Sequence, residues 1–302
     1  LMGLFREELA SYKEKVGKEK AASTYRGLVA DYNNLLLFLK EKRRIEDIAI
    51  ADLDKKFIED YYNWMLGTCA LASSTAFCRV NTLKWLMYTA QERGWIKLHP
   101  FIGFDCLPEY KRRSFLTEED LQRVIHVKLN YKRQRAIRDM FLFMCFTGLA
   151  YADLKEITYK NIHTDSEGGT WLMGNRIKTG VSYVVKLLPI AIELVERYKG
   201  ENKKKSSPDK VFPVGEYQTM VSSLRVLTQK CGCSTEITPH IGRHTFAVLA
   251  ILKGMPLETL QKVLGHKSIL STQIYAELIN PKVGEDTDKL CMKIGDVYRL
   301  TN

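Results

Sequence analysis

Apolar residues recur every three or four positions along most of this chain. In the first hundred residues, Leu28, Tyr32, Leu35 and Leu39 follow this spacing, and the stretches on either side repeat it. Residues with this spacing share one face of an α-helix, and such a face must be buried against another element. The pattern therefore predicts a small bundle of four or five helices in residues 1–107.

The helical pattern breaks at residues 108–114, which carry three basic side chains and no periodicity. A short charged stretch between two periodic regions is typical of an interdomain linker. A chain of 302 residues is also long for one domain and sufficient for two. We therefore expect one domain in residues 1–107 and a second domain in residues 115–302.

The second region combines helices with the main strand-like stretch of the sequence. Thr117 opens it with the Thr-x-x-acid pattern of a helix N-cap, and a buried helix is expected around residues 136–147. Residues 170–178 and 183–188 then flank a turn that contains Gly180, as the two strands of a β-hairpin do. Helices dominate after the hairpin. The expected fold class is mainly α with a small β-hairpin or sheet, an α+β arrangement.

The charge of the chain bears on its partners. Lys and Arg number 46 against 35 Asp and Glu, which gives a formal net charge of +11. Neutralisation of phosphates and release of counterions make a polyanion such as double-stranded DNA a favourable partner for such a protein. A basic surface that has no partner explains the same composition equally well.

The cysteines and the hydropathy pattern bear on location. Seven cysteines, odd in number and scattered, indicate reduced thiols and a cytoplasmic protein. Cys231 and Cys233 lack a second pair at zinc-ligand spacing, so we expect no metal. No apolar run reaches the ~18 residues of a membrane span, and no signal peptide is recognisable. The chain begins with Leu, so it is compatible with a fragment.

His240 and Arg243 form the first candidate site. Thr238 and Pro239 have the sequence of a helix start, and residues at i and i+3 share one helix face. Free N–H groups and the helix dipole favour an anion there, and the Arg fork matches a phosphate. A structural His beside a surface Arg is the alternative. His244 follows at i+4, but without the HExxH pattern of a zinc protease.

Tyr275 is the second candidate. A helix is expected to end at Gly265, His266 stands just beyond it, and Tyr275 follows nine residues later near the start of another helix. A tyrosine can act as a covalent nucleophile. The alternative is an ordinary core tyrosine on an amphipathic helix.

Taken together, these motifs resemble the tyrosine recombinase (phage integrase) family. The resemblance covers residues from about 115 to 280, and the helical first hundred residues look like that family's SAM-like core-binding domain. A branch of Bacteroides-type integrases of conjugative elements is especially similar. The motifs, in chain order, are Phe146-Thr147-Gly148-Leu149 followed by Asp153-Leu154, Arg176-Ile177-Lys178-Thr179, Thr238 through Ala247, and Leu264-Gly265-His266 through Tyr275.

The resemblance implies a role for each matched residue. Tyr275 attacks the scissile phosphate and forms a 3′-phosphotyrosyl ester, while Arg243 and His240 hold its non-bridging oxygens. His266 supports the phosphate, and Lys178 is the general acid for the 5′-oxygen. Asp153, in the motif after Thr-Gly-Leu, joins the expected site. Phosphoryl transfer needs mainly positioning and charge stabilisation, so neither a metal nor another cofactor is expected.

The sequence departs from the family's pattern at Ala150, where the first catalytic arginine normally follows Thr-Gly-Leu. On an extended strand, Arg176 and Lys178 lie on the same face because alternate side chains point the same way. We therefore expect Arg176 to supply the missing guanidinium. The alternatives are that Arg176 pairs with an acid on the sheet surface, or that the enzyme is impaired.

The first domain offers candidate phosphate contacts at two expected helix starts. Small hydroxyls and cations at helix N-termini suit phosphate groups, although ordinary capping explains them as well. The candidate DNA-binding residues are Ser23, Thr24, Arg26, Ser73, Thr75, Arg79 and Lys84.

The family implies a site-specific integrase that inserts or excises a mobile element in the bacterial cytoplasm, associated with the nucleoid when bound. It implies a homotetramer on two DNA sites, with DNA-bending accessory factors as further partners and no membrane. The amphipathic stretch 288–294 is expected to dock on a neighbouring protomer, and packing on its own domain is the alternative. An additional N-terminal arm-binding domain is compatible with the resemblance. A non-catalytic DNA-binding protein and a type IB topoisomerase are the alternatives.

Overall fold

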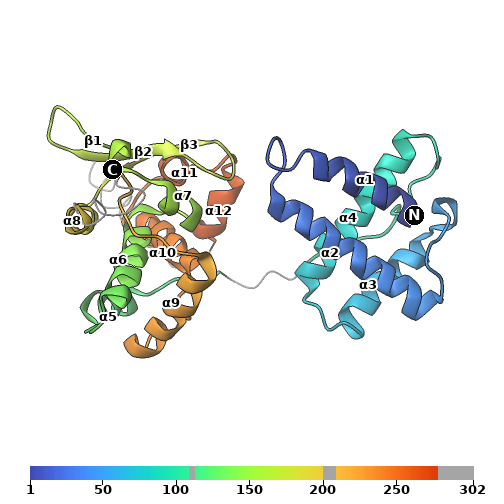
Figure 1. The fold of residues 1–302 in the computed structure, drawn as a ribbon, viewed down its shortest axis with the longest axis horizontal. Helices are drawn as coiled ribbons and strands as arrows, with labels where there is room; N and C mark the ends of the chain where they lie inside the picture. Colours follow the sequence, from blue (N-terminus) through green and yellow to red (C-terminus); the bar gives the residue numbers. More distant parts are fainter. Residues whose placement is uncertain (109–112, 200–208, 278–302) are drawn as a thin grey trace, which may run out of the picture. The chain divides into compact units, whose positions relative to one another are not determined.

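The computed structural model describes residues 1–108, 113–199 and 209–277. The chain divides into two compact units, Leu1–Lys111 and Arg112–Asn302 (Figure 1). The division falls inside the stretch 108–114, which was predicted to be a linker. The expected stretch 288–294 lies outside the described residues.

The first unit is helical in its described residues. Its core surrounds Phe38, whose ring packs against Phe57, Tyr61 and Trp64 with centroid distances of 5.4, 5.1 and 5.4 Å. Buried aromatic rings of this kind bring large apolar areas together and lock helix against helix. The elements are α1 (Met2–Glu14), α2 (Ala22–Phe38), the π-helical turn η1 (Leu39–Arg43), the 3-10 turn η2 (Ile50–Asp52), α3 (Lys55–Gly67) and α4 (Ser73–Glu92).

Two helix starts differ in detail from the expectation. The N-caps of α2 and α4 are Ala21 and Ala72, and neither makes a side-chain capping bond. Ser23 therefore lies inside the first turn of α2, not at its cap. Asp54 does cap α3, because its side chain accepts a hydrogen bond from the Phe57 N–H.

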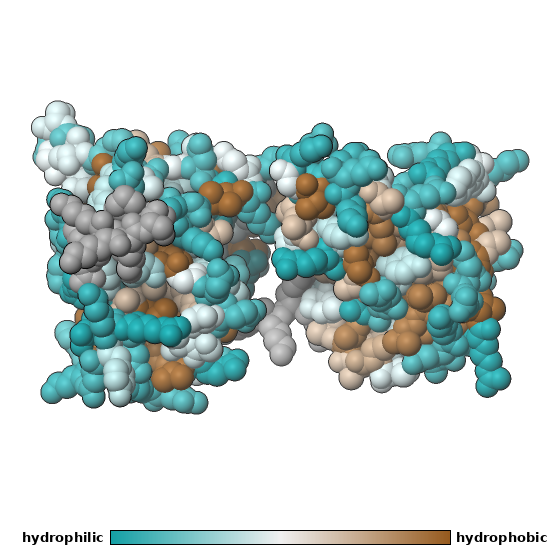
Figure 2. Space-filling model, viewed as in Figure 1, coloured by the Kyte–Doolittle hydropathy of each residue, from teal (hydrophilic) through white to brown (hydrophobic). Residues whose placement is uncertain are grey.

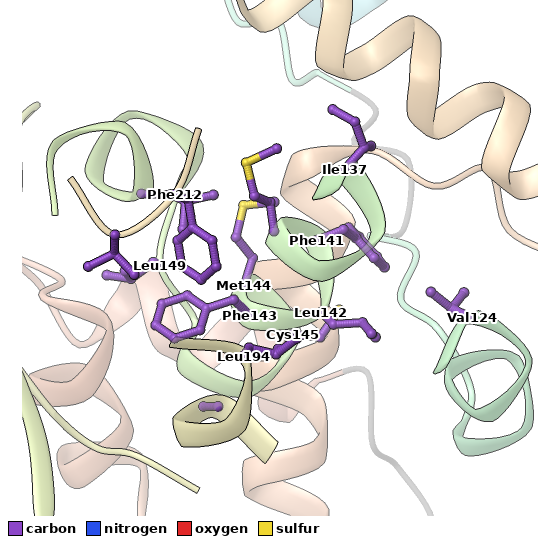
Figure 3. Packing of buried hydrophobic residues seen from close by; sticks show 14 of the residues in the cluster. Val124, Ile137, Phe141, Leu142, Phe143, Met144, Cys145, Leu149, Leu194 and Phe212 are labelled. Atoms are coloured by element: carbon purple, nitrogen blue, oxygen red, sulfur yellow. The ribbon is translucent and has the colours of Figure 1, made fainter. Parts of the chain in front are cut away.

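The second unit wraps its other elements around α6. The second half of this helix carries the consecutive buried residues Phe141 to Cys145, so this part of the helix is apolar on all sides (Figure 3). The elements are α5 (Glu118–His126), α6 (Lys132–Thr147), α7 (Tyr151–Glu156), the 3-10 turn η3 (Tyr159–Asn161), β1 (Ile162–Thr164), β2 (Thr170–Asn175), β3 (Ser182–Lys186), α8 (Pro189–Tyr198), α9 (Tyr217–Cys231), α10 (Pro239–Leu252), α11 (Leu257–Leu264) and α12 (Leu270–Ala276).

The strands form a three-stranded antiparallel sheet in the order β1-β2-β3. The hairpin of β2 and β3 was predicted, whereas β1 was not. Strand β2 ends at Asn175, paired with Ser182, so the prediction that Arg176 and Lys178 lie on an extended strand is wrong. The chain turns instead, because the N–H groups of Thr179 and Gly180 both donate to the Arg176 carbonyl.

The caps predicted in this unit are present. Thr117 accepts from the Asp120 N–H, and Thr238 accepts from the Ile241 N–H with Pro239 in the first turn. Gly265 ends α11 in the left-handed region, at φ +61°. The predicted fold class, mainly helical with a small sheet, is confirmed.

The surface of both units mixes hydrophilic and hydrophobic residues (Figure 2). Within the described ranges, no helix combines the length and the apolar character that crossing a bilayer requires.

Candidate active site

Four segments of the second unit bring the candidate residues together. These are the N-terminal half of α10, the turn after β2, the end of α11 and the short helix α12. Helix α11 packs on β3, and α12 packs on both α10 and α11 (Figure 1). Residues that are far apart in the sequence therefore meet beside one end of the hairpin.

Arg243 lies at the centre of this arrangement and is only 5% exposed. Its Nη1 donates to the Gly148 carbonyl at 2.6 Å, and its Nη2 donates to the Leu264 carbonyl at 2.7 Å. Burial, followed by the nearby charge of Arg176, lowers the pKa of Arg243 to about 10. The guanidinium still carries its charge at neutral pH, and its orientation is set by two backbone carbonyls.

Gly148 makes this close approach possible. It ends α6 at φ +72°, and a Cβ on it would stand 2.6 Å from side-chain atoms of both Leu264 and Phe246. Only glycine fits such a left-handed and crowded position without displacing its neighbours. Ala150 follows two residues later as the N-cap of α7.

Arg176 reaches the same place from the hairpin turn. Its Nη1 lies 3.0 Å from Oδ2 of Asp153 and donates to the Leu264 carbonyl at 3.4 Å, so Arg176 and Arg243 share that oxygen. Asp153 is buried, and its Oδ1 accepts the Ile177 N–H at 2.9 Å. The carboxylate thus holds both the turn and the arginine.

This pairing combines two expectations about Arg176. The residue does pair with an acid, but with a buried one beside the site rather than one on the sheet surface. Its stem also packs on Gly265, where a Cβ would stand 2.8 Å from the Arg176 Cγ. The side chain therefore has a defined place near Arg243.

Tyr275 is buried, with 1% of its surface exposed. Its phenol oxygen lies 2.9 Å from Nδ1 of His244. The His266 ring lies parallel to the phenol ring, with centroids 6.4 Å apart, and the Arg113 guanidinium lies over that ring at 5.8 Å. Three groups from three segments therefore surround the predicted nucleophile.

His266 follows the left-handed Gly265, and its Nδ1 lies 2.9 Å from the hydroxyl oxygen of Thr272. Burial, followed by the charges of Arg243, Arg176 and Arg113, lowers its pKa to about 4. The ring is thus neutral at pH 7 and directed by α12.

His240 and Lys178 are both exposed at the rim of the cluster. The His240 ring lies 6.3 Å from the His244 ring. Neighbouring side chains exclude part of the water around the ring, and this partial desolvation, followed by the charges of Arg243, Arg113, Lys178 and Arg176, lowers the pKa of His240. Because these cations act on one imidazole, Lys178 belongs to the same positive region as the two buried arginines.

Sequence reasoning missed two residues of this cluster. His244 directly follows Arg243 and stands at i+4 from His240, a spacing that was noticed only for its lack of a zinc motif. Arg113 was counted only as one of the linker cations. No local signal linked either residue to Tyr275, because both contacts depend on the packing of α12.

The cluster has the electrostatics of an anion site. Arg113, Arg176, Lys178 and Arg243 bring four positive charges around neutral imidazoles, and Asp153 opposes them with one carboxylate. Across the ranges that the structure describes, no group of three or more His, Cys, Asp and Glu residues could hold a metal ion. The arrangement can orient and neutralise a phosphate next to a phenol.

The candidate DNA contacts of the first unit differ in accessibility. Ser23, Thr24 and Arg26 are exposed in the first turns of α2. Arg79 is largely buried, with its Nε 3.6 Å from Oδ1 of Asp31, and Lys84 lies over the ring of Phe101. Ser73 is half-buried and Thr75 is exposed at the start of α4.

Known proteins match both units of the chain. Residues 114–280 match the phage integrase family, and residues 1–107 match the phage integrase SAM-like domain. The chain belongs to the phage integrase family. The division between the two units falls in the short gap between the two matched regions.

Curated relatives carry the name of tyrosine recombinases. Tyrosine recombinase XerA of Saccharolobus solfataricus is 32% identical over 176 residues, which span 57% of this chain and 56% of that protein. The match thus covers little more than half of that relative. A tyrosine recombinase of Pseudothermotoga lettingae is 23% identical over 87% of this chain and 90% of its own length.

Solved structures show the same fold. A lambda integrase dimer bound to a COC′ core site has a TM-score of 0.70 at 17% identity, covering 91% of this chain and 94% of that one. The Tn1549 transposon integrase in complex with transposon right end DNA has a TM-score of 0.69 at 17% identity, covering 91% and 93%. The predicted family is confirmed, and the predicted recombinase activity agrees with the names of these relatives.

The buried imidazoles predict a pH response. The pKa values of His244 and His266 are lowered to about 4, mainly by burial, whereas an unfolded histidine titrates near 6.5. As the pH falls below about 6.5 the unfolded chain takes up protons first, so these residues lower stability between about pH 6.5 and 4. Above about pH 6.5 both histidines are neutral in the folded and the unfolded chain, so this loss of stability is absent there.

NMR titration of the six histidine rings, assigned with single His→Gln variants, measures these midpoints. We expect two rings to titrate near pH 4 in the folded protein and near 6.5 in urea. Midpoints that stay the same on unfolding would contradict the burial of both imidazoles.

Proposed function

We propose that this chain is a site-specific DNA recombinase that cleaves and rejoins DNA through a 3′-phosphotyrosyl bond on Tyr275. The observation that carries the proposal is the position of the Tyr275 phenol oxygen. This oxygen lies inside a positive cluster built from separate segments, next to His244 and beside the buried guanidinium of Arg243. A merely structural tyrosine would not need such surroundings.

The geometry supports a division of labour. A phosphodiester bound at the cluster places its non-bridging oxygens near Arg243, Arg176, His240 and His266, which stabilise the developing charge. Attack by Tyr275 breaks the bond to the 5′-oxygen, and Lys178 donates a proton to that oxygen. The phosphotyrosyl ester conserves the energy of the broken phosphodiester bond, so rejoining the strand needs no nucleoside triphosphate.

Tyr275 is too buried in this structure for a phosphodiester to reach its oxygen. A reacting pair must approach to about 3–3.5 Å. Helix α12, which carries Tyr275, has only seven residues. We propose that DNA binding shifts α12 or its neighbours and thereby exposes the nucleophile.

Arg176 is the proposed replacement for the arginine missing at Ala150. It shares the Leu264 carbonyl with Arg243, so the two guanidiniums lie side by side. The pair with Asp153 supports this role, because it holds the arginine in place. Asp153 acts here as a positioning residue for the arginine and the hairpin turn.

The proposed partner is double-stranded DNA, on which the protein works as a homotetramer joining two sites, with DNA-bending accessory factors. The structural neighbours bound to a COC′ core site and to transposon right end DNA support DNA as the partner. We place the chain among Bacteroides-type integrases of conjugative elements on its Thr-Gly-Leu-Ala-Tyr-Ala-Asp motif. Its proposed location is the cytoplasm, at the nucleoid.

The first prediction concerns the nucleophile. Tyr275→Phe removes the attacking oxygen, so it should bind DNA like the wild type and form no covalent complex. The measurement uses a nicked duplex carrying a site selected by binding from a random-sequence pool, and denaturing gels detect the adduct. An adduct formed by Tyr275→Phe would refute the assignment. A wild type that binds without any adduct would indicate a non-catalytic DNA-binding protein.

The second prediction concerns Arg176. Loss of one preorganised donor at a reacting centre costs roughly 100- to 1,000-fold in rate. Arg176→Ala should slow single-turnover cleavage by about that factor with little loss of DNA affinity, and adding Ala150→Arg should restore part of the rate. Arg225→Ala, on an exposed arginine paired with Glu236, is the matched control. A wild-type cleavage rate for Arg176→Ala would show that Arg176 does not replace the arginine missing at Ala150.

The third prediction separates two candidate DNA contacts of the first unit. Arg26 is exposed, whereas Arg79 is engaged with Asp31. Arg26→Ala should therefore lower DNA affinity and flatten its dependence on salt by about one phosphate contact. Arg79→Ala should change the salt slope less. Equal salt slopes for the wild type and Arg26→Ala, measured by fluorescence anisotropy, would exclude the start of α2 as a phosphate contact.

A further inference from the structure

Nδ1 of His244 lies 2.9 Å from the phenol oxygen of Tyr275. The Arg243 guanidinium also bonds to that oxygen, but it can only donate and cannot take a proton. A general base must stand within about 2.6–3.2 Å of the atom whose proton it takes. The motif that assigns roles to His240, Arg243, His266 and Tyr275 assigns none to His244. The inference below rests on the proposed role of Tyr275 as the nucleophile.

The protonation state of His244 suits an acceptor. Burial, and then the charges of Arg113, His240 and Arg243, lower its pKa to about 4. The ring is therefore neutral at pH 7. With its own proton on Nε2, its Nδ1 lone pair accepts the hydrogen bond that the phenol donates.

The other two histidines of the cluster are placed differently. Nδ1 of His266 is engaged with the hydroxyl of Thr272, and the His266 ring lies parallel to the phenol ring. His240 is exposed, and its ring is next to the His244 ring. Their positions suit contact with a phosphate, whereas that of His244 suits contact with the nucleophile.

We propose that His244 is the proton acceptor for Tyr275 during strand cleavage. As the bond between the phenol oxygen and phosphorus forms, the phenol proton moves to Nδ1 of His244. As the bond between phosphorus and the 5′-oxygen breaks, Lys178 protonates that oxygen and becomes neutral. Rejoining reverses both transfers, so protons and charge balance over the cycle.

The charges around His244 make this transfer depend on DNA. In the free protein the cations Arg113 and Arg243, with His240 and His266 nearby, oppose a positive charge on His244. A phosphodiester brings negative charge into the cluster and offsets that repulsion. The imidazole thus becomes a stronger base when the substrate is present, which limits premature activation of the tyrosine.

The test compares two substitutions at His244 in single-turnover cleavage of the nicked duplex by the full chain. His244→Asn keeps a hydrogen-bond acceptor but cannot take a proton, and His244→Phe removes both properties. General-base catalysis contributes about 100- to 10,000-fold. Both variants should therefore lose at least about 100-fold in cleavage rate while binding DNA like the wild type.

Two readouts separate proton transfer from simple orientation. Without a base, the phenol must lose its proton to hydroxide, so the rate of His244→Asn should rise steeply with pH while that of the wild type does not. A substrate with sulfur in place of the bridging 5′-oxygen has a leaving group that needs no acid. This substrate should rescue Lys178→Ala and should not rescue His244→Asn.

His126→Asn, on an exposed histidine bonded to Gln122, is the matched control and should cleave like the wild type. If His244→Asn cleaves at the wild-type rate and only His244→Phe is slower, the inference is overturned. His244 would then only orient the Tyr275 phenol through its hydrogen bond. Rescue of His244→Asn by the sulfur substrate would overturn the inference as well. Failure of the proposed function is distinct, because the wild type would then form no adduct that depends on Tyr275.

Discussion

The hydrogen bonds from Arg243 to the carbonyls of Gly148 and Leu264 join three segments that the sequence separates widely. Gly148 is the left-handed glycine that ends α6, and Leu264 is the last residue of α11, directly before the left-handed Gly265. A buried guanidinium needs such partners, because an unpaired buried charge is very costly. Because α6 is the centre of the core, Arg243 has a rigid support. The arrangement of the whole site follows from that support.

The chemistry of the site follows from an imbalance of charge. The described cluster places four cations around one carboxylate, and that carboxylate, Asp153, is already engaged by Arg176. The buried imidazoles of His244 and His266 stay neutral because burial and the same cations oppose their protonation. This excess of positive charge suits the phosphodiester of the proposed reaction. Tyr275, the proposed nucleophile, is buried beside these groups.

Several features could be predicted from local sequence because local rules govern them. Helical spacing located the bundle and α6, and the caps at Thr117 and Thr238 marked helix starts that the structure contains. The spacing of His240 and Arg243 placed both on one turn of α10. The third strand β1 was missed because three residues carry too little periodicity. The strand assignment of Arg176 failed because its carbonyl accepts the N–H groups that close the turn.

The sequence by itself determined most of the helices, the hairpin, their order and the residue types available for phosphate chemistry, because spacing and caps act over a few residues. Only the tertiary structure decided which of these residues touch. The contact between His244 and Tyr275 spans 31 residues, and that between Arg176 and the Leu264 carbonyl spans 88. Such contacts depend on how α11 and α12 pack on α10 and the sheet. Burial then set the charge states, because the pKa of a histidine depends on the surroundings that packing creates.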